Sequence, residues 1–287
     1  MQDTAASYWR RSLLAGIVSL SAVVIAVGIG LAVMAIQDAT RPGVSEAGET
    51  DSRDRVTLHA TLESVSAAQG TFTMRIWPTP HGKLANGSVS AADLSVSISG
   101  ATGSDLVFRA GERLGGRSVT VEFQEGDTSR YPFDQHSVDI YFSVTAEGTS
   151  VPSELVFNST DALYRTELLF IPDETEPGLR IEVSRSFGTF VMVTVMFGVM
   201  WALALAVAGA AVLIIVRRLG IVWPALGWMA ATLFALSAFR GVAPGAPPIG
   251  VLLDYTAFLW AEVIVATSLV AVVVAGLARE FRNPAPS

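Results

Sequence analysis

Residues of the types that carry out chemistry are few in this chain, and their spacing matches no known catalytic or metal site. The sequence has no cysteine, and its three histidines, His59, His81 and His136, lack the spacing of metal ligands. No glycine-rich phosphate loop leads from a strand into a helix, and no nucleophile elbow is present. Asp134 and Asp139 are close in sequence, but the turn and strand between them direct their side chains differently. We therefore predict no enzymatic activity, no catalytic residues, no cofactor and no metal site.

Three ionisable residues in or beside long apolar segments are candidates for a membrane polar site. Glu262 lies well inside the apolar segment from Val251 to Leu277, and charges within membrane spans are rare and often functional. The alternative is a packing residue, protonated or hydrogen-bonded to another helix near Trp228, Ser237 or Thr267. In either case we expect Glu262 to face the interior of the helix bundle. Arg240 and Asp254 stand at the outer ends of adjacent segments, where we expect a structural ion pair.

Four apolar segments position these residues. They run over Leu13–Ile36, Phe187–Val216, Ile221–Phe239 and Val251–Leu277. The chain as a whole is 51% hydrophobic and 16% charged, whereas soluble proteins carry about 25% charged residues. The first segment is longer than the roughly 7–15 apolar residues of a signal peptide and has no tidy cleavage site, so we expect an uncleaved anchor. The sequence thus predicts four transmembrane helices.

The basic residues near these segments predict their orientation. Drawn as four spans, the segments leave six arginines on one side of the membrane: Arg10, Arg11, Arg217, Arg218, Arg279 and Arg282. The loop 240–250 on the opposite side has one basic residue. Because cytoplasmic loops carry the excess of Lys and Arg, both termini are expected in the cytoplasm of a multi-pass plasma-membrane protein. The region between the first two spans is then extracytoplasmic.

The sequence of this extracytoplasmic region predicts β-strands. Apolar and polar residues alternate from Val56 to Glu63 and from Val138 to Val144, which is typical of half-buried antiparallel strands. We predict an α+β membrane protein, with an extracytoplasmic antiparallel β-sandwich plus four transmembrane helices. The predicted parts are an anchor (1–37), a linker (38–54), the sandwich (55–185), a three-helix membrane domain (186–278) and a cytoplasmic tail (279–287).

The net charge of the chain restricts the classes of molecule that it can bind. The formal net charge is −7, and acidic residues concentrate in the predicted extracytoplasmic region. Contact with phosphates needs clustered Lys and Arg, so we expect no nucleic acid as a partner. The expected partners are membrane lipids, another membrane or envelope protein, or a second copy of the chain.

One motif resembles pentameric ligand-gated ion channels. The sequence Arg-Tyr-Pro-Phe-Asp-Gln-His at 130–136 is similar to the channel loop whose aromatic-Pro-x-Asp turn touches the membrane domain. Arg185 precedes the second span, where those receptors keep an arginine, and residues 247–254 resemble their loop between the second and third membrane helices. The resemblance implies that Tyr131, Pro132, Phe133, Asp134 and Arg185 couple the domain to the membrane. It also implies an ion pair between Asp134 and Arg185.

A second resemblance covers more of the chain. The stretch 240–254, with Arg240, its prolines and Asp254, resembles an uncharacterised family of four-span membrane proteins found mainly in actinobacteria and fungi. That family supplies a topology but no chemistry. The receptors, in contrast, place all four helices after the domain, whereas one span precedes it here.

Two functions remain open at this point. The outer sandwich of a non-catalytic accessory or sensor protein could bind a protein, a lipid or an envelope component. Alternatively, the chain forms an oligomeric ion channel related to the pentameric receptors. The third segment favours the first function, because Trp223, Trp228 and Phe234 are bulky and only Thr232 and Ser237 are small and polar. Cation pores usually need rings of acidic or hydroxyl side chains.

Overall fold

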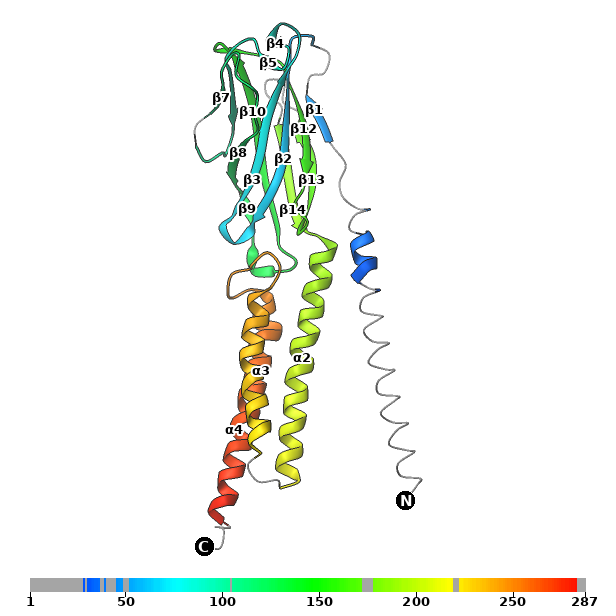
Figure 1. Cartoon of the computed structure of the whole chain (residues 1–287), viewed down its shortest axis with the longest axis vertical. Coiled ribbons are helices and arrows are strands. Elements are labelled where there is room, and N and C mark those ends of the chain that lie inside the picture. Colours follow the sequence, from blue (N-terminus) through cyan, green and yellow to red (C-terminus); the bar gives the residue numbers. More distant parts are fainter. Residues whose placement is uncertain are drawn as a thin grey trace. The chain divides into compact units, whose positions relative to one another are not determined.

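The computed structural model describes residues 28, 30–36, 39, 45–48, 52–103, 105–171, 178–218 and 222–282. The chain divides into two compact units, residues 1–41 and 42–287. In the first unit residues 30–36 are helical, and most of the predicted anchor Leu13–Ile36 lies outside the described residues. The second unit contains a β-sandwich-like region followed by helices (Figure 1).

Two sheets form the β-region. The first has the order β1 (Ser45–Gly48), β12 (Ser153–Ser159), β2 (Val56–Ser66), β3 (Thr71–Pro80) and β8 (Arg117–Glu122). The second has the order β13 (Tyr164–Ile171), β14 (Gly178–Arg185), β10 (Gln135–Ala146), β6 (Leu94–Ile98) and β7 (Leu106–Phe108). Two short strands, β9 (Glu125–Gly126) and β11 (Thr149–Ser150), pair with β10. A separate hairpin joins β4 (Ala85–Asn86) to β5 (Val89–Ser90).

The predicted alternation places the core between the sheets. Along β10 every second residue is buried, from Val138 to Val144, while Ser137 and Asp139 are partly exposed. Residues of β2 and β3 face the same core, including Leu58, Leu62, Phe72 and Ile76. Burial of apolar surface stabilises by about 25 cal/mol per Å², so these side chains hold the two sheets together.

Two features of the β-region differ from the prediction. The sandwich is not purely antiparallel, because β12 pairs with β2 in parallel. The alternation predicts strands but not their directions, so this pair left no signal in the sequence. In addition, residues 45–48 of the predicted linker 38–54 form β1, which pairs with β12. A four-residue strand is too short for its pattern to be recognised.

The helical part contains α2 (Phe187–Val216), α3 (Trp223–Gly241) and α4 (Leu259–Arg282). The hydroxyl of Ser186 accepts the backbone N–H of Thr189 and caps α2 one residue after β14 ends. A single π-helical turn, η4 (Asp254–Phe258), precedes α4, and the Thr256 carbonyl accepts a hydrogen bond from Trp201 of α2 at 3.2 Å. Short 3-10 helices are η1 (Ala67–Gln69), η2 (Gly82–Leu84) and η3 (Thr128–Arg130).

Two helices in the described residues are long and apolar enough to cross a membrane. They are Phe187–Val216, with a mean hydropathy of 2.7, and Asp254–Phe281, with 2.3. We predicted four transmembrane helices, and two helices of the described part of the chain meet the criteria of length and hydropathy. The third predicted segment forms the 19-residue α3, whose tryptophans, proline, glycines and Arg240 make it less apolar.

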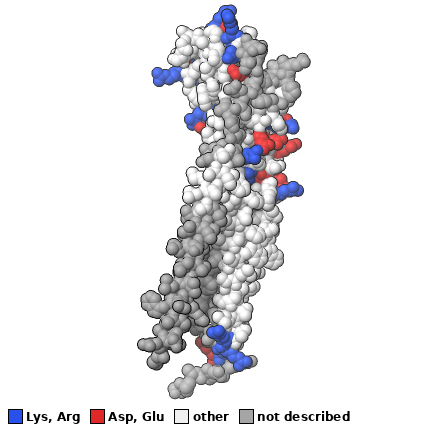
Figure 2. Space-filling model, turned by 90° about the vertical axis from the view of Figure 1, so that its right-hand side faces the viewer, with Lys and Arg blue, Asp and Glu red and all other residues white. Residues whose placement is uncertain are grey.

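Charged residues are distributed unevenly over the surface. On the face shown in Figure 2, they gather on the β-region and at the far end of the helices, with uncharged surface between them. Many apolar side chains of the helices are exposed, including Leu205 and Val212 of α2 and Val270 and Val274 of α4. Small buried residues such as Ala204 and Ala261 line the inner faces of α2 and α4, and small side chains let helices approach closely.

Candidate functional site: the junction between sandwich and helices

The residues predicted to couple the domain to the membrane lie together where the sandwich meets the helices. The turn from η3 into β10 supplies Tyr131 to Asp134, and the end of β14 supplies Arg185. Residues 242–253, between α3 and η4, form the α3–α4 loop, which reaches this turn. Three segments that are distant in sequence therefore meet at one place.

Asp134 and Arg185 form the centre of the junction. Arg185 Nε lies 2.9 and 3.1 Å from the two carboxylate oxygens of Asp134, and Nη2 lies 2.8 Å from Oδ2. Their side chains are 0% and 3% exposed, so the pair is removed from water. His136 Nε2 lies 3.4 Å from the same carboxylate. Burial acts to raise the pKa of Asp134, but the hydrogen bonds from His136 and Arg185 hold that pKa below its usual range.

Two tyrosines enclose the guanidinium of Arg185. Its carbon lies 4.9 Å from the centre of the Tyr131 ring and 4.4 Å from the centre of the Tyr164 ring. Such contacts attract a cation to the negative face of a ring. Burial raises the pKa of each of the two phenols to about 12, against an opposing effect of the Arg185 charge. Both phenols are thus uncharged at neutral pH, and their rings pack against the buried Arg185 guanidinium.

The same groups contact the α3–α4 loop. The Pro244 carbonyl accepts a hydrogen bond from Tyr131 Oη at 3.1 Å and a longer one from Arg185 Nη1 at 3.5 Å. Gly245 has a φ of +74°, and a Cβ atom built there would collide with the Arg185 guanidinium. Tyr131 is fully buried and packs within the apolar cluster of the helices rather than that of the sandwich.

The remaining members of the predicted set are at the edge of the junction. Pro132 follows Tyr131 through a cis peptide bond. Phe133 is 59% exposed and meets Phe190 of α2 edge to face, with ring centres 5.5 Å apart. Phe133 therefore adds an aromatic contact between the turn and the first turn of α2.

A second ion pair fixes the α3–α4 loop, as expected for Arg240 and Asp254. The guanidinium and the carboxylate are joined by two contacts of 2.8 Å. Arg240 also donates to the carbonyls of Pro247 and Pro248, at 3.0 and 2.7 Å. Asp254 accepts the backbone N–H groups of Gly250 and Val251, at 2.7 and 3.2 Å. The pair therefore folds the loop back onto the ends of both helices.

Glu262 is placed differently from the prediction. Its carboxylate accepts a 2.5 Å hydrogen bond from Ser237 of α3, which was one of the expected partners. However, Glu262 is only partly buried and Ser237 is exposed, so the pair lies on the outer surface of the helices rather than in their interior. Buried positions between α3 and α4 are taken by apolar side chains such as Met229, Leu236 and Val265.

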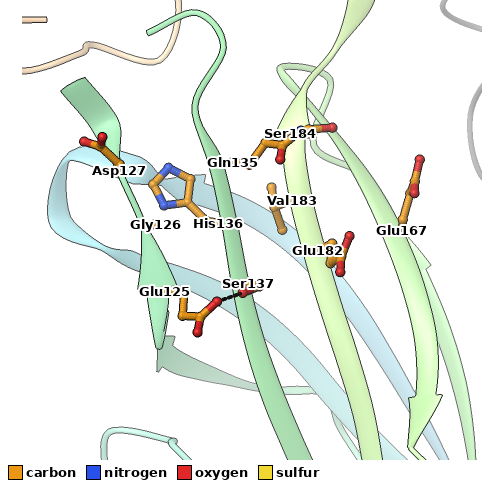
Figure 3. Close-up of a pocket in the computed structure, with 10 residues that line it drawn as sticks. All are labelled: Glu125, Gly126, Asp127, Gln135, His136, Ser137, Glu167, Glu182, Val183 and Ser184. Atoms are coloured by element: carbon orange, nitrogen blue, oxygen red, sulfur yellow. Dashed lines mark hydrogen bonds between the residues drawn. The ribbon is translucent and has the colours of Figure 1, made fainter. Parts of the chain in front are cut away.

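An acidic pocket of about 570 Å³ opens beside the junction, on strands β9, β10, β13 and β14 (Figure 3). Glu125, Asp127, Glu167 and Glu182 line it, together with Ser137 and His136. Across the sheet Glu125 pairs in register with Ser137, Ser137 with Glu182, and Glu182 with Glu167. In the described residues no group of three or more His, Asp or Glu side chains could hold a metal ion.

Of the other two histidines, His59 lies on β2 of the first sheet and His81 directly follows β3. His59 stacks on Trp77, with ring centres 5.2 Å apart. His81 Nε2 lies 2.9 Å from the Thr57 hydroxyl, which donates to Glu154 at 3.0 Å. These contacts satisfy the polar groups of neighbouring strands.

Sequence reasoning missed three members of the junction: Tyr164, Pro244 and Gly245. Tyr164 begins β13 and looks like any buried strand residue in the sequence. The Pro-Gly dipeptide at 244–245 indicates a turn, but nothing in the sequence says what that turn contacts.

The comparisons with known proteins divide the chain at this junction. Residues 46–183 match the model described as a domain of unknown function (DUF4436). Residues 185–279 match a second model, also described as a domain of unknown function (DUF8686). No curated protein gave a significant match. The two matches fit an uncharacterised family and assign no activity.

Proposed function

We propose that this protein is a non-catalytic accessory or sensor of the plasma membrane, whose outer sandwich binds a partner protein, a lipid or an envelope component. In this proposal the chain crosses the membrane four times, with both termini in the cytoplasm and residues 55–185 outside. Membrane lipids surround the helices. A conformational change in the sandwich is transmitted through the helices to a neighbouring membrane protein or to a second copy of the chain.

The observation that carries this proposal is the buried contact of Arg185 with both Asp134 and Pro244. Asp134 belongs to the sandwich and Pro244 to the α3–α4 loop, while Arg185 lies two residues before α2. A charge buried in this way is costly to separate from its partner. Movement of the sandwich is therefore transmitted to α2 and to the α3–α4 loop rather than absorbed by a flexible linker.

The alternative is an oligomeric ion channel related to the pentameric receptors. Its support is the hydrogen bond between Glu262 and Ser237, a polar pair on the surface of otherwise apolar helices. A second subunit could cover this pair, since a carboxylate facing lipid is unfavourable. Against a pore lined by α3, Trp223 and Phe234 are 74% and 80% exposed, and such bulky side chains would occlude a narrow channel.

The membrane topology can be tested by thiol labelling, because the chain has no cysteine of its own. Single cysteines at Ser88 and Ile249 should react with an impermeant maleimide on intact cells. Ile249 is 93% exposed, so its reactivity reports on sidedness rather than burial. Cysteines at Ser7 and Ser287 should react only after permeabilisation. Labelling of Ser7 in intact cells would reject the four-span topology.

The functional class can be tested by ion flux into vesicles containing the purified protein. An accessory or sensor should give no flux on its own, in the wild type or in Glu262→Gln, and the variant should keep its thermal stability because the amide retains hydrogen-bonding capacity. Robust wild-type flux that disappears in Glu262→Gln would reject this function in favour of the channel. The mass of the detergent-extracted assembly provides a second criterion, because such a channel requires a closed ring.

A further inference from the structure

One buried hydroxyl at the junction has no hydrogen-bond partner. Tyr164 is 4% exposed, and its Oη is the sole buried side-chain polar atom in the described residues without a hydrogen bond. The backbone N–H of Ala67 is directed toward this oxygen but does not reach hydrogen-bond geometry. An N–H group can only donate, so the Tyr164 hydroxyl hydrogen would still lack an acceptor. Leaving a buried donor without an acceptor is unfavourable, and native structures rarely do so.

An acceptor is available nearby, but the other tyrosine uses it. Tyr131 and Tyr164 lie on the Arg185 guanidinium, and Tyr131 Oη donates to the Pro244 carbonyl at 3.1 Å. The next residue, Gly245, runs beside Tyr164: a methyl group at Gly245 would lie 3.4 Å from Tyr164 Oη. The α3–α4 loop therefore lies close to both phenols and accepts a hydrogen bond from one of them.

Two consecutive residues of the loop at this point have a positive φ. Gly245 has a φ of +74° and Ala246 one of +43°, which is unfavourable for a residue with a side chain. Glycine adopts positive and negative φ about equally readily, so rotation of the peptide group before Gly245 has little steric cost at that residue. Rotation near Gly245 would turn a loop carbonyl from Tyr131 toward Tyr164 while Arg185 stays paired with Asp134.

We propose that the α3–α4 loop is a two-position latch, in which a loop carbonyl bonds either to Tyr131 or to Tyr164. The structure records the first position. Each position satisfies one phenol and leaves the other without an acceptor, so the two differ mainly by the long 3.5 Å contact of Arg185 Nη1 with the Pro244 carbonyl, and a bias from the sandwich can exchange them. The latch deepens the proposed function, since it identifies the element that changes when the sandwich binds its partner. Its existence can be tested without knowing that partner.

The test uses fluorine NMR on the full-length protein in detergent. A trifluoromethyl tag is attached to a single cysteine at Ile249, which lies in the loop and is 93% exposed. Four proteins carry the tag: the tagged parent, Tyr131→Phe, Tyr164→Phe and, as the control, Tyr141→Phe. Tyr141 is a partly exposed residue of β10, away from the loop. Each substitution removes one hydroxyl and keeps the ring.

The latch predicts two resonances in the parent and the same two in Tyr141→Phe. Tyr164→Phe should lose the second resonance, because phenylalanine has no hydroxyl to donate to the loop carbonyl in the second position. Tyr131→Phe should raise the population of the second resonance by roughly three- to tenfold, the effect of one hydrogen bond. Tyr164→Phe removes an unsatisfied group and should fold normally, so its spectrum alone can decide if Tyr131→Phe proves unstable.

Three results would overturn the latch. A single unchanged resonance in every protein would mean that the loop has one position and that water satisfies Tyr164. A second resonance that persists in Tyr164→Phe would mean that the loop moves for another reason. Equal populations in Tyr131→Phe and the parent would show that the Pro244 contact does not hold the loop. None of these results bears on ion flux, so the latch and the proposed function can fail separately.

Discussion

Arg185 donates hydrogen bonds to both carboxylate oxygens of Asp134, at distances of 2.8 to 3.1 Å, across 51 positions of sequence. This is the ion pair expected from the order of the aromatic turn and the arginine before α2. Within the described part of the sandwich, its burial distinguishes it from the other ion pairs, which are partly or largely exposed, apart from the contact of His136 with the same carboxylate.

We expect Asp134→Ala to lower the free energy of unfolding by about 3–5 kcal/mol, because it leaves the Arg185 charge buried without a partner. The double variant with Arg185→Ala should recover part of that loss. Chemical unfolding of the detergent-extracted wild type, the two single variants and the double variant measures the four free energies of this cycle. Strictly additive losses in the cycle would show that the two side chains do not interact energetically.

An exposed ion pair of the same sheet serves as the control. Arg180 Nε lies 2.6 Å from Asp139 on neighbouring strands, but the Arg180 side chain is 48% exposed. The same substitutions there should each cost only about 0–1 kcal/mol, since water competes for both groups. The contrast separates burial from hydrogen-bond geometry, which is good in both pairs.

Gly245→Ala should destabilise the junction through two effects. The residue has a φ of +74°, and the added methyl group would collide with the Arg185 guanidinium. Gly87→Ala is the matched control, because Gly87 has a φ of +64° and no atom within 4 Å of an added Cβ. Backbone strain alone costs about 1–2 kcal/mol. Thermal unfolding should show a larger loss for Gly245→Ala, and equal losses would exclude a role for the collision.

The sequence predicts the parts of this protein whose signal is local. A long apolar run between Arg185 and Arg217 corresponds to α2, and two-residue alternation corresponds to the strands on either side of the core. The Asp134–Arg185 pair was also predictable, because a motif resemblance gave both residues a position relative to the membrane. Each of these inferences needs only neighbouring residues or their order.

The rest depends on contacts between distant segments. Nothing local to β12 reveals that it runs parallel to β2, and nothing local to Tyr164 reveals that it encloses Arg185. Glu262 was expected inside the bundle because charge is costly in lipid, yet it bonds to Ser237 at the surface. Apolar side chains fill the contacts between the helices, so the carboxylate finds its hydrogen-bond partner on their outer face.

A titration effect is expected for His59. Burial lowers the pKa of His59, Glu154 raises that pKa in opposition, and His81 lowers it further. The folded state therefore favours neutral imidazole, so its contribution to stability is complete above the unfolded pKa of about 6.5 and is lost as the pH falls from there through the lower pKa of the folded state. Unfolding measured between pH 7.5 and 5 should show this loss.

His59→Phe tests that assignment, because it keeps an aromatic ring to stack on Trp77 but cannot titrate. We expect the variant to lose less stability than the wild type over the same pH range. The comparison uses the slope against pH rather than the absolute stability, which the substitution also alters. Identical slopes would assign the pH dependence to other groups.

Glu182→Gln should raise stability, because Glu182 lies in register opposite Glu167 on the neighbouring strand of the acidic pocket. Like charges opposite each other on a sheet are destabilising, by roughly 0.2–1 kcal/mol. Added salt should reduce the gain, since it screens exposed charges. Glu122→Gln is the control, because Glu122 pairs with Thr71 and meets no opposite carboxylate in the register. A loss of stability in Glu182→Gln would instead mean that attraction to Arg180 exceeds the repulsion between the two glutamates.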